Sequence, residues 1–380
     1  MKKVSGEYTT SVLLTDGSFK HTLATVRSLG GHGLEVSVAD SSSIAQSFFS
    51  KYCRNRYRIP RPSWSPIEYI KTLREILQNK HHDVLLPIGW EANYYISKYV
   101  DLLNSYTKIP IVNHETMSIA ANKDMTMKYA KRVGITIPKT FSPKSVEEIE
   151  GLVQEQEFPY VVKGSTDSGH VIYAKDIQEL KWSFEKLKQF RPIIQEYVDG
   201  YGCGFFALYD NGKCIAEFMH KRVREFPPTG GPSVAAMSYF SPALRKQGRQ
   251  LLDSLKWHGV AMVEFKRDAK DGKYKLIEVN PKFWGSLELA MASGVDFPYL
   301  AYKLANEEKQ IPQISYRKGV VFRWPFPGDF LNALSTHTIS RFFSSFGNLE
   351  IHDDIRISDI GPLPIQLIIT INSIRKRERM

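Results

Sequence analysis

The sequence predicts an α/β protein in which an N-terminal parallel sheet is followed by a mixed region of strands and helices. Over the first hundred residues, apolar strand-like segments alternate with helical ones, and this order favours parallel strands joined by right-handed crossovers. Further along, two apolar segments, 261–268 and 275–280, flank a polar turn and predict a hairpin. A chain of 380 residues is too long for one small core, so about two or three domains are expected.

Composition narrows the class of protein. Hydrophobic residues make up 42% and aromatic residues 12% of the chain, which is typical of a globular protein. Cys53, Cys203 and Cys214 have no paired-motif spacing, so neither a disulfide framework nor a zinc site is predicted. The first residues lack the apolar core of a signal peptide, and no apolar run reaches the ~18 residues of a membrane span. We therefore expect a cytoplasmic protein.

The formal net charge of +11 raises the question of nucleic-acid binding. The basic residues are spread along the chain, and no nucleic-acid-binding module is recognisable. Anionic small-molecule substrates explain the positive potential equally well, so no nucleic-acid partner is expected. The short basic tail 375–379 follows an apolar run, 360–371, which we interpret as a buried strand, with contact to a membrane surface as the alternative.

The N-terminal elements follow in order. Strands are expected at 11–15, 34–39 and 83–88, and helices at 19–29 and 66–79. The first turn, 16–20, lacks the G-x-G-x-x-G pattern that lets a backbone approach pyrophosphate, so a nicotinamide site is excluded. Asp40 is therefore interpreted as a strand-end residue.

The next elements lead to a loop that can bind phosphate. A helix is expected near 118–133, opened by Asn122 and followed by Gly134 as its cap. A strand over 158–163 brings Lys163 to its end, and the small-residue loop 164–171 can bind phosphate through backbone N–H groups. A helix at 175–189 and a strand at 192–198 follow.

The predicted hairpin places three oxygen-bearing side chains on one face. Glu278 and Asn280 are two residues apart on a strand, and the hairpin brings Glu264 beside them. Two carboxylates and an amide would be costly to bury without a partner. These are hard oxygen ligands, so one or two magnesium ions are the expected partner, and magnesium held this way usually serves a nucleoside triphosphate.

Together these motifs resemble the ATP-grasp superfamily over roughly residues 110–310. The resemblance rests on the ordered set Lys123-Asp124, Val162-Lys163 with its glycine loop, 195–198, Glu264 and 278–281. The stretch 220–233 is similar to a branch of uncharacterised ATP-dependent carboligases of carboxylate–amine ligase type. The resemblance implies a pre-ATP-grasp Rossmann-like domain at 1–112, an ATP-grasp domain at 113–315 with lobes at 125–197 and 198–315, and a C-terminal extension at 316–380.

The resemblance also implies roles for individual residues. The nucleotide-binding set would be Lys123, Lys163, Ser168, Gly169, Glu196, Tyr197 and Val198, with the lysines on phosphates and 196–198 as the hinge beside adenine. Glu264, Glu278 and Asn280 would bind two magnesium ions, with manganese as an alternative metal. Arg222 and Arg224 would neutralise the transferred phosphoryl group. Glu91, Gly230, Gly231, Ser233 and Trp284 would contact substrate. Gly202 stands where many relatives carry a ribose-binding glutamate, so the ribose contact is left open, with Asp199 as one candidate.

These roles imply an ATP-dependent ligase. ATP would phosphorylate a carboxylate, and an amine would attack the acyl phosphate, with ADP and phosphate released. The alternatives are a bicarbonate-using carboxylase-type enzyme and a nucleotide-binding regulatory protein without turnover. Small-molecule acids and amines are the expected partners, and a homodimer is left open. For the last 65 residues we expect a strand from 320, a helix at 330–346 and strands at 349–357 and 365–371, which complete the fold, cover the site or bind a partner.

Overall fold

The computed structural model describes residues 10–153, 157–166, 169–228, 230–308, 315–348 and 350–377. The N-terminal part is a four-stranded sheet in the order β3-β2-β1-β4, and all its pairings are parallel, as the sequence predicts. Its elements are β1 (Ser11–Leu14), α1 (Lys20–Gly31), β2 (Glu35–Asp40), β3 (Cys53–Arg58), α2 (Pro66–Asn79), β4 (Val84–Leu86) and α3 (Trp90–Lys98). The sequence reading missed β3, an edge strand in which arginines at every second position replace the apolar pattern.

Two helices connect this sheet to a small antiparallel one. The helices are α4 (His114–Ala121) and α5 (Lys123–Arg132), where a single helix was predicted over 118–133. Asn122 is extended (φ −115°, ψ 112°) and its side chain accepts the Met125 N–H, so it ends one helix and caps the next. The small sheet, in the order β5-β8-β6-β7, contains β5 (Thr140–Phe141), β6 (Tyr160–Lys163), β7 (Val171–Ala174) and β8 (Ile193–Glu196), with α6 (Ile177–Leu187) packed against it.

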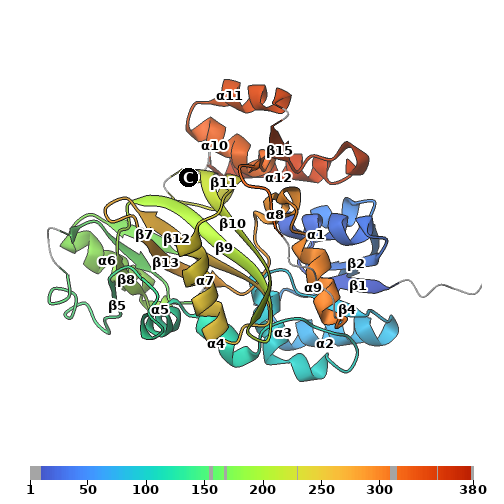
Figure 1. Ribbon diagram of the computed structural model, residues 1–380, viewed down its shortest axis with the longest axis horizontal. Helices are drawn as coiled ribbons and strands as arrows, with labels where there is room; N and C mark the ends of the chain where they lie inside the picture. The colour runs from blue at the N-terminus through green and yellow to red at the C-terminus, as the bar shows by residue number, and fades with distance from the viewer. Residues whose placement is uncertain are drawn as a thin grey trace, which may run out of the picture.

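A seven-stranded sheet forms the centre of the molecule (Figure 1). In spatial order it contains β13 (Tyr274–Asn280), β12 (Gly259–Asp268), β9 (Gly200–Asp210), β10 (Lys213–Glu225), β11 (Ser233–Ser238), β14 (Val321–Arg323) and β15 (Ile351–Asp353). The predicted hairpin is therefore confirmed as β12–β13. Along β9, Phe205 and Tyr209 pack in the core shared with α7 (Pro242–Ser254), whereas Phe206 and Leu208 face the N-terminal part.

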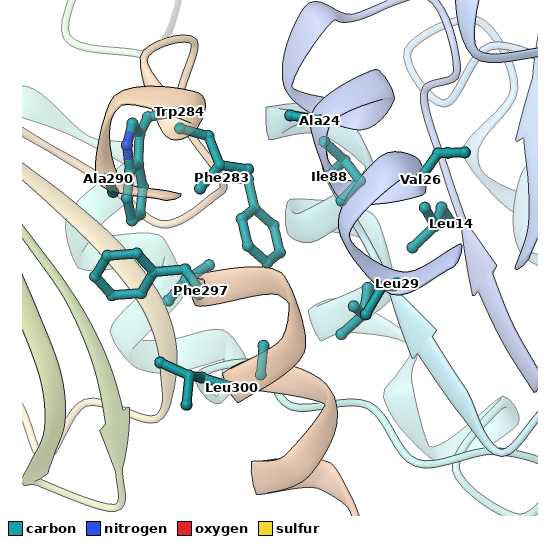
Figure 2. Packing of buried hydrophobic residues seen from close by; sticks show 14 of the residues in the cluster. Leu14, Ala24, Val26, Leu29, Ile88, Phe283, Trp284, Ala290, Phe297 and Leu300 are labelled. Atoms are coloured by element: carbon teal, nitrogen blue, oxygen red, sulfur yellow. The ribbon is translucent and has the colours of Figure 1, made fainter. Parts of the chain in front are cut away.

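The central sheet and the N-terminal sheet share one hydrophobic core. Helices α8 (Leu287–Ser293) and α9 (Phe297–Ala305) pack against α1. Figure 2 shows Phe283, Trp284, Phe297 and Leu300 on one side of this core and α1 with Leu29 on the other. Because this packing is continuous, the N-terminal sheet is held in a fixed position against the central one.

The C-terminal residues extend the central sheet and add short helices over its end (Figure 1). After β14 come a helical turn η5 (Pro325–Asp329), α10 (Phe330–Ser335), α11 (Ile339–Ser344), β15 and α12 (Leu363–Arg377). The helix predicted at 330–346 is thus two short helices, separated near His337, whose φ is 55°. The strand predicted at 349–357 is reduced to β15.

The strand predicted at 365–371 is wrong, because this segment lies in α12. Ile365, Gln366 and Thr370 are buried while Leu367, Ile368 and Ile371 are exposed, which is the one-sided burial of a helix. Pro364 lies in the first turn, where a missing N–H costs no helical hydrogen bond. Among the described residues, no helix combines the length and the apolar character needed to cross a membrane.

Candidate functional site

A cavity of about 940 Å³ lies between the small sheet, the central sheet and the C-terminal helices. The small sheet contributes Lys163, Gln195 and the residues that follow β8, and the central sheet contributes Arg222, Glu264 and Glu278. Residues of α10, α11 and β15 close another side. The cavity is large enough for a nucleotide together with a second small molecule.

The predicted carboxylate pair lies on the wall formed by the hairpin. Glu264 and Glu278 are directly opposite each other across β12 and β13, and Asn280 is opposite Met262. Next to this pair, Phe265 is opposite Leu276, so Ile277 has no partner on β12 and forms a bulge. Ile277 also lines the cavity. The Asn280 side chain donates a 2.8 Å hydrogen bond to Glu278 Oε1, so all three predicted metal ligands lie together.

The two carboxylates differ in their surroundings. Burial, opposed by the Arg222 guanidinium and reinforced by the nearby Glu278 carboxylate, raises the pKa of Glu264. Burial would raise the pKa of Glu278 too, but Lys123, Asn280 and Lys163 together lower it below its usual range. Two like charges on one cavity wall leave room for a cation that would relieve their repulsion.

This donor set fits magnesium. Magnesium commonly takes one or two protein carboxylates and completes its octahedron with waters and phosphate oxygens. The described residues hold no group of three or more His, Cys, Asp or Glu side chains suited to a metal. Two carboxylates alone would leave magnesium short of ligands, so water or a bound ligand would have to complete its coordination.

Both predicted phosphate lysines interact electrostatically with Glu278. Lys123, the first residue of α5, has its Nζ 3.6 Å from Glu278 Oε2. Lys163 donates a 2.8 Å hydrogen bond to Gln195 Oε1 on the neighbouring strand. Burial, with Glu278 opposing it and Lys123 reinforcing it, lowers the pKa of Lys163 to about 8. Gly169 has a φ of 63°, which suits glycine, and Ser168 lies outside the described residues.

The predicted hinge lines the cavity between the two sheets, and two lysines that sequence reasoning missed hold it. Lys275 Nζ lies 2.6 Å from Glu196 Oε1. Lys266 donates to the Val198 carbonyl at 2.9 Å and lies 5.0 Å from the centre of the Tyr197 ring. Lys266 is two residues from Glu264 on β12, so the strand period alone could have placed it on the cavity wall.

Arg222 lies across the floor of the cavity. Its guanidinium donates to Glu264 Oε2 at 2.8 Å, to Glu225 Oε1 at 3.2 Å and to the Gly231 carbonyl at 3.0 Å. Glu264, followed by Glu225, raises the pKa of Arg222, so the side chain is always charged. The guanidinium thus joins β10 to β12 across the intervening β9.

Gly202 on β9 allows the Arg222 side chain to reach across this strand to β12. A Cβ at Gly202 would lie 2.8 Å from Arg222 Cδ and 3.3 Å from Glu225 Oε1. Gly202, where the resemblance would place a ribose-binding glutamate, is therefore covered by the side chains of Arg222 and Glu225. Asp199 does not line the cavity, whereas Glu225 does.

Arg224 has a different environment from Arg222. It makes a two-pronged pair with Asp329, at 2.7 Å and 2.8 Å, and Asp329 is only 3% exposed. This geometry is the one in which arginine and carboxylate bind most strongly. Arg224 lines the cavity, but its charge is already neutralised by the C-terminal segment.

The five predicted substrate residues separate into two groups. Gly230 and Gly231 line the cavity, and a Cβ on Gly231 would collide with the Phe226 backbone at 2.1 Å, so only glycine allows this turn. Three others do not line it. The Ser233 carbonyl lies 3.5 Å from Lys20 Nζ, Trp284 is 1% exposed and packs in the shared core (Figure 2), and Glu91 lies in the first turn of α3. The Trp284 indole packs against Phe206 and Phe297.

Glu91 lies near Asp16 and Asp40 at the carboxyl edge of the N-terminal sheet, and its contact with substrate stays a prediction. Burial, with small additions from Asp40 and Glu91, raises the pKa of Asp16 to about 6. Asp16 accepts the Gly89 N–H at 2.8 Å and has a φ of 59°. These contacts tie the ends of neighbouring strands together.

A family model described as "ATP-grasp in the biosynthetic pathway with Ter operon" matches residues 191–324. The N-terminal section of the carbamoyl phosphate synthase large chain of Methanopyrus kandleri is 25% identical over 298 residues, which are 67% of this chain and 52% of that protein. The D-aspartate ligase of Enterococcus faecium is 20% identical over 309 residues, covering 74% of this chain and 72% of that protein. The chain spans about half or less of the length of the carbamoyl phosphate synthase chains it matches.

Among solved structures, the N5-carboxyaminoimidazole synthetase of Staphylococcus aureus superposes with a TM-score of 0.68 at 14% identity, covering 90% of this chain and 88% of that one. The same protein has also been solved in complex with ADP. At this identity the likeness concerns the fold. The chain is thus similar to ATP-grasp proteins over residues 191–324, and its fold is that of the synthetase.

Proposed function

We propose that the protein is an ATP-dependent ligase that joins a carboxylate to an amine through an acyl phosphate and releases ADP and phosphate. One observation carries the proposal. Two lysines, two carboxylates and Arg222 converge on one cavity of about 940 Å³, which has room for a nucleotide and an acid together. Catalysis of phosphoryl transfer needs positioned charge more than a protein nucleophile, and this cavity is lined with positioned charge.

Each residue then has a defined role. Lys163 and Lys123 hold the phosphates, and the backbone of 196–198 contacts the base. Arg222 faces the transferred phosphoryl group from β10, and its pairs with Glu264 and Glu225 fix the direction of its guanidinium. The carboxylate oxygen of the substrate attacks the γ-phosphorus, the bond to the ADP oxygen breaks, and the amine nitrogen then displaces phosphate from the acyl carbon.

Two magnesium ions, or manganese in their place, are part of the proposal. Glu264, Glu278 and Asn280 would hold them, and the metal would supply charge neutralisation between the β- and γ-phosphates. Glu225 is proposed as the ribose contact, because its carboxylate lies where a side chain on Gly202 would point. The domain limits 1–112, 113–315 and 316–380 belong to the same proposal.

The nucleotide product tests the reaction. The protein is incubated with ATP, magnesium, a panel of carboxylic acids and hydroxylamine, which traps acyl phosphates as hydroxamates. We expect ADP and phosphate in equal amounts with hydroxamate. AMP as the main product would reject the acyl-phosphate route, and ATP binding with no acid-dependent turnover would favour the nucleotide-binding regulatory protein instead.

A bicarbonate-using enzyme is the second candidate. The similarities to a carbamoyl phosphate synthase chain and to an N5-carboxyaminoimidazole synthetase favour it, because both are named for products that contain a carboxylated amine. Labelled bicarbonate separates the candidates. ADP release that depends on bicarbonate in carbon-dioxide-depleted buffer, with no hydroxamate from other acids, would select this alternative.

A further inference from the structure

One side of the cavity is formed by the C-terminal residues Ala333, Thr336, Thr338, Arg341, Phe342, Ser345 and Ile351, which we call the C-terminal wall. None of them belongs to the motifs that carry the ATP-grasp resemblance. The wall combines apolar side chains, hydroxyl groups and one guanidinium. Such a lining can bind an organic molecule that has both an apolar part and a negative charge.

The C-terminal wall is fixed to the strand that carries Arg222. Asp329, which precedes α10, pairs with Arg224 of β10 at 2.7 Å and 2.8 Å. Asn332 donates a 2.7 Å hydrogen bond to the Glu225 carbonyl at the end of the same strand. Arg323, fully buried on β14, donates to the Phe342 carbonyl at 3.1 Å. These contacts hold the wall in place, so it is a permanent part of the cavity.

Arg341 differs from every other cation that lines this cavity. Lys123, Arg222 and Arg224 have carboxylate partners, and Lys163 and Lys266 donate to oxygens of Gln195 and Val198. The Arg341 guanidinium, on the exposed side of α11, makes no ion pair, hydrogen bond or ring contact with any residue that the structure describes. Its charge and its five donors are therefore free for a ligand.

We propose that Arg341 binds a carboxylate that does not react, carried by one of the two substrates. The inference rests on the proposed ligase function and extends it to a substrate class. Arginine binds a carboxylate through two parallel hydrogen bonds, which gives direction as well as affinity. The apolar side chains of Ala333, Phe342 and Ile351 lie on the same wall and suit an aliphatic spacer.

The sheet order sets the shape of this substrate. The metal-binding carboxylates lie on β13 and β12, and α11 is held over β14, four strands from β12. Strands are spaced by about 4.8 Å, so the two ends of the cavity are about 19 Å apart at the backbone. Long side chains from both ends shorten that span. The reacting group and the second carboxylate are then separated by several bonds.

The non-reacting carboxylate has two sources, and the assay separates them. If the acid carries it, Arg341→Ala raises the KM for α,ω-dicarboxylates from succinate to adipate in the hydroxylamine assay, and leaves their monoamides unaffected. If the amine carries it, hydroxamate formation is unchanged, but the KM for 4-aminobutyrate and 6-aminohexanoate rises relative to propylamine and pentylamine. In either case we expect a change of about 10- to 100-fold, with kcat and the KM for ATP changed less than twofold.

Two variants provide the controls. Arg375→Ala removes the same charge from α12, where Arg375 is exposed and does not line the cavity, and it should behave as wild type. Arg341→Lys keeps the charge but loses the two-pronged geometry, so it should recover only part of the affinity. A structural defect would not show this partial rescue together with unchanged ATP kinetics.

Direct binding separates failure of this inference from failure of the proposed function. The same acids and amines are titrated by calorimetry into wild type and Arg341→Ala with magnesium and a non-hydrolysable ATP analogue. Arg341-dependent binding without turnover would reject the ligase function and keep the carboxylate site. Turnover that is indifferent to Arg341, or no preference of wild type for any charged ligand over its uncharged partner, would overturn the inference.

Discussion

The two ends of the cavity handle charge in opposite ways. At the hairpin end, Lys123 faces Glu278 and Arg222 faces Glu264, so cations and carboxylates already compensate one another. At the C-terminal wall, the guanidinium of Arg341 lacks any such partner among the described residues. A compensated set can accept a ligand that brings both signs, such as a polyphosphate with its magnesium. An uncompensated guanidinium accepts an anion alone.

The largest effect is expected from Glu278→Gln. This change removes one of two negative charges at the proposed metal site, where Glu278 lies directly opposite Glu264. Loss of several kcal/mol of transition-state stabilisation would lower kcat by about 100-fold or more. ADP formation at saturating magnesium measures it.

The control for this variant is Glu75→Gln, on the exposed side of α2 and far from the cavity lining. It removes the same charge and should keep wild-type turnover. Circular dichroism should show that both variants are folded. Near-wild-type turnover by Glu278→Gln would remove the hairpin from the catalytic site.

The second effect concerns the attachment of the C-terminal wall. Asp329→Ala leaves Arg224 without its partner and removes the carboxylate 3.8 Å from the fully buried Arg323. The Arg224 side chain is 25% exposed and Arg323 keeps Asp353 at 3.8 Å, so the loss should lie between that of an exposed and that of a fully buried pair, at about 1–3 kcal/mol. Denaturant unfolding should show this loss as a lower transition midpoint.

Asp271→Ala is the matched control for Asp329→Ala. Asp271 pairs with Lys273 at 3.8 Å, and both side chains are exposed (39% and 67%). Exposed pairs contribute about 0–1 kcal/mol, so the midpoint should barely move. Equal losses in the two variants would mean that the Arg224–Asp329 pair does not hold the wall.

The hairpin end could be predicted from the sequence, and the C-terminal wall could not. The strand period places Glu278 and Asn280 on one face, and the polar turn between the apolar segments predicts the hairpin that adds Glu264. These are local regularities. The register skip at Ile277 and the use of Gly202 as a crossing point depend on contacts between distant strands, which no single segment encodes.

The errors at the C-terminus have a physical cause. The run 360–371 is apolar enough for a buried strand, and prolines interrupt it. Only tertiary packing decides, because Gln366 is buried through its hydrogen bonds to Gln46 and Asp354, while Leu367 beside it is exposed. Likewise, nothing in the sequence indicates that Asp329 lies beside Arg224, which is 105 residues earlier in the chain.

The third expected effect is a pH dependence of ATP binding at the hairpin end of the cavity. The pKa of Lys163 is lowered to about 8, chiefly by burial. Below pH 8 the free protein carries the charge that attracts phosphate, and above pH 8 it progressively loses it. ATP affinity should therefore fall by about tenfold between pH 7 and pH 9, and adenosine affinity should not change.

Lys163→Ala checks that this pH dependence belongs to Lys163. Calorimetric titration should show ATP bound about 10- to 100-fold more weakly at pH 7, with adenosine unchanged and the pH dependence gone. If ATP and adenosine weakened equally, Lys163 would lie outside the phosphate site.

The smallest effect is expected from a change at Gly202, the glycine of β9 over which the Arg222 side chain lies. Gly202→Ala puts a Cβ 2.8 Å from Arg222 Cδ, which is too close for any real contact, and the flexible arginine must move. Its 2.8 Å hydrogen bond to Glu264 would then lengthen. We expect kcat to fall by about tenfold while the unfolding midpoint shifts little, because the strand itself need not move.

Two comparisons assign this effect to Arg222. Gly31→Ala, at a glycine with no atom within 4 Å of an added Cβ, should leave both activity and stability unchanged. Since Gly202→Ala acts by displacing Arg222, it should add nothing to an Arg222→Ala background, and the double-mutant cycle should show a coupling about as large as the single effect. Additive effects in that cycle would mean that the alanine disturbs the cavity without displacing Arg222. The proposed catalytic role of the Arg222–Glu264 contact between β10 and β12 would then be rejected.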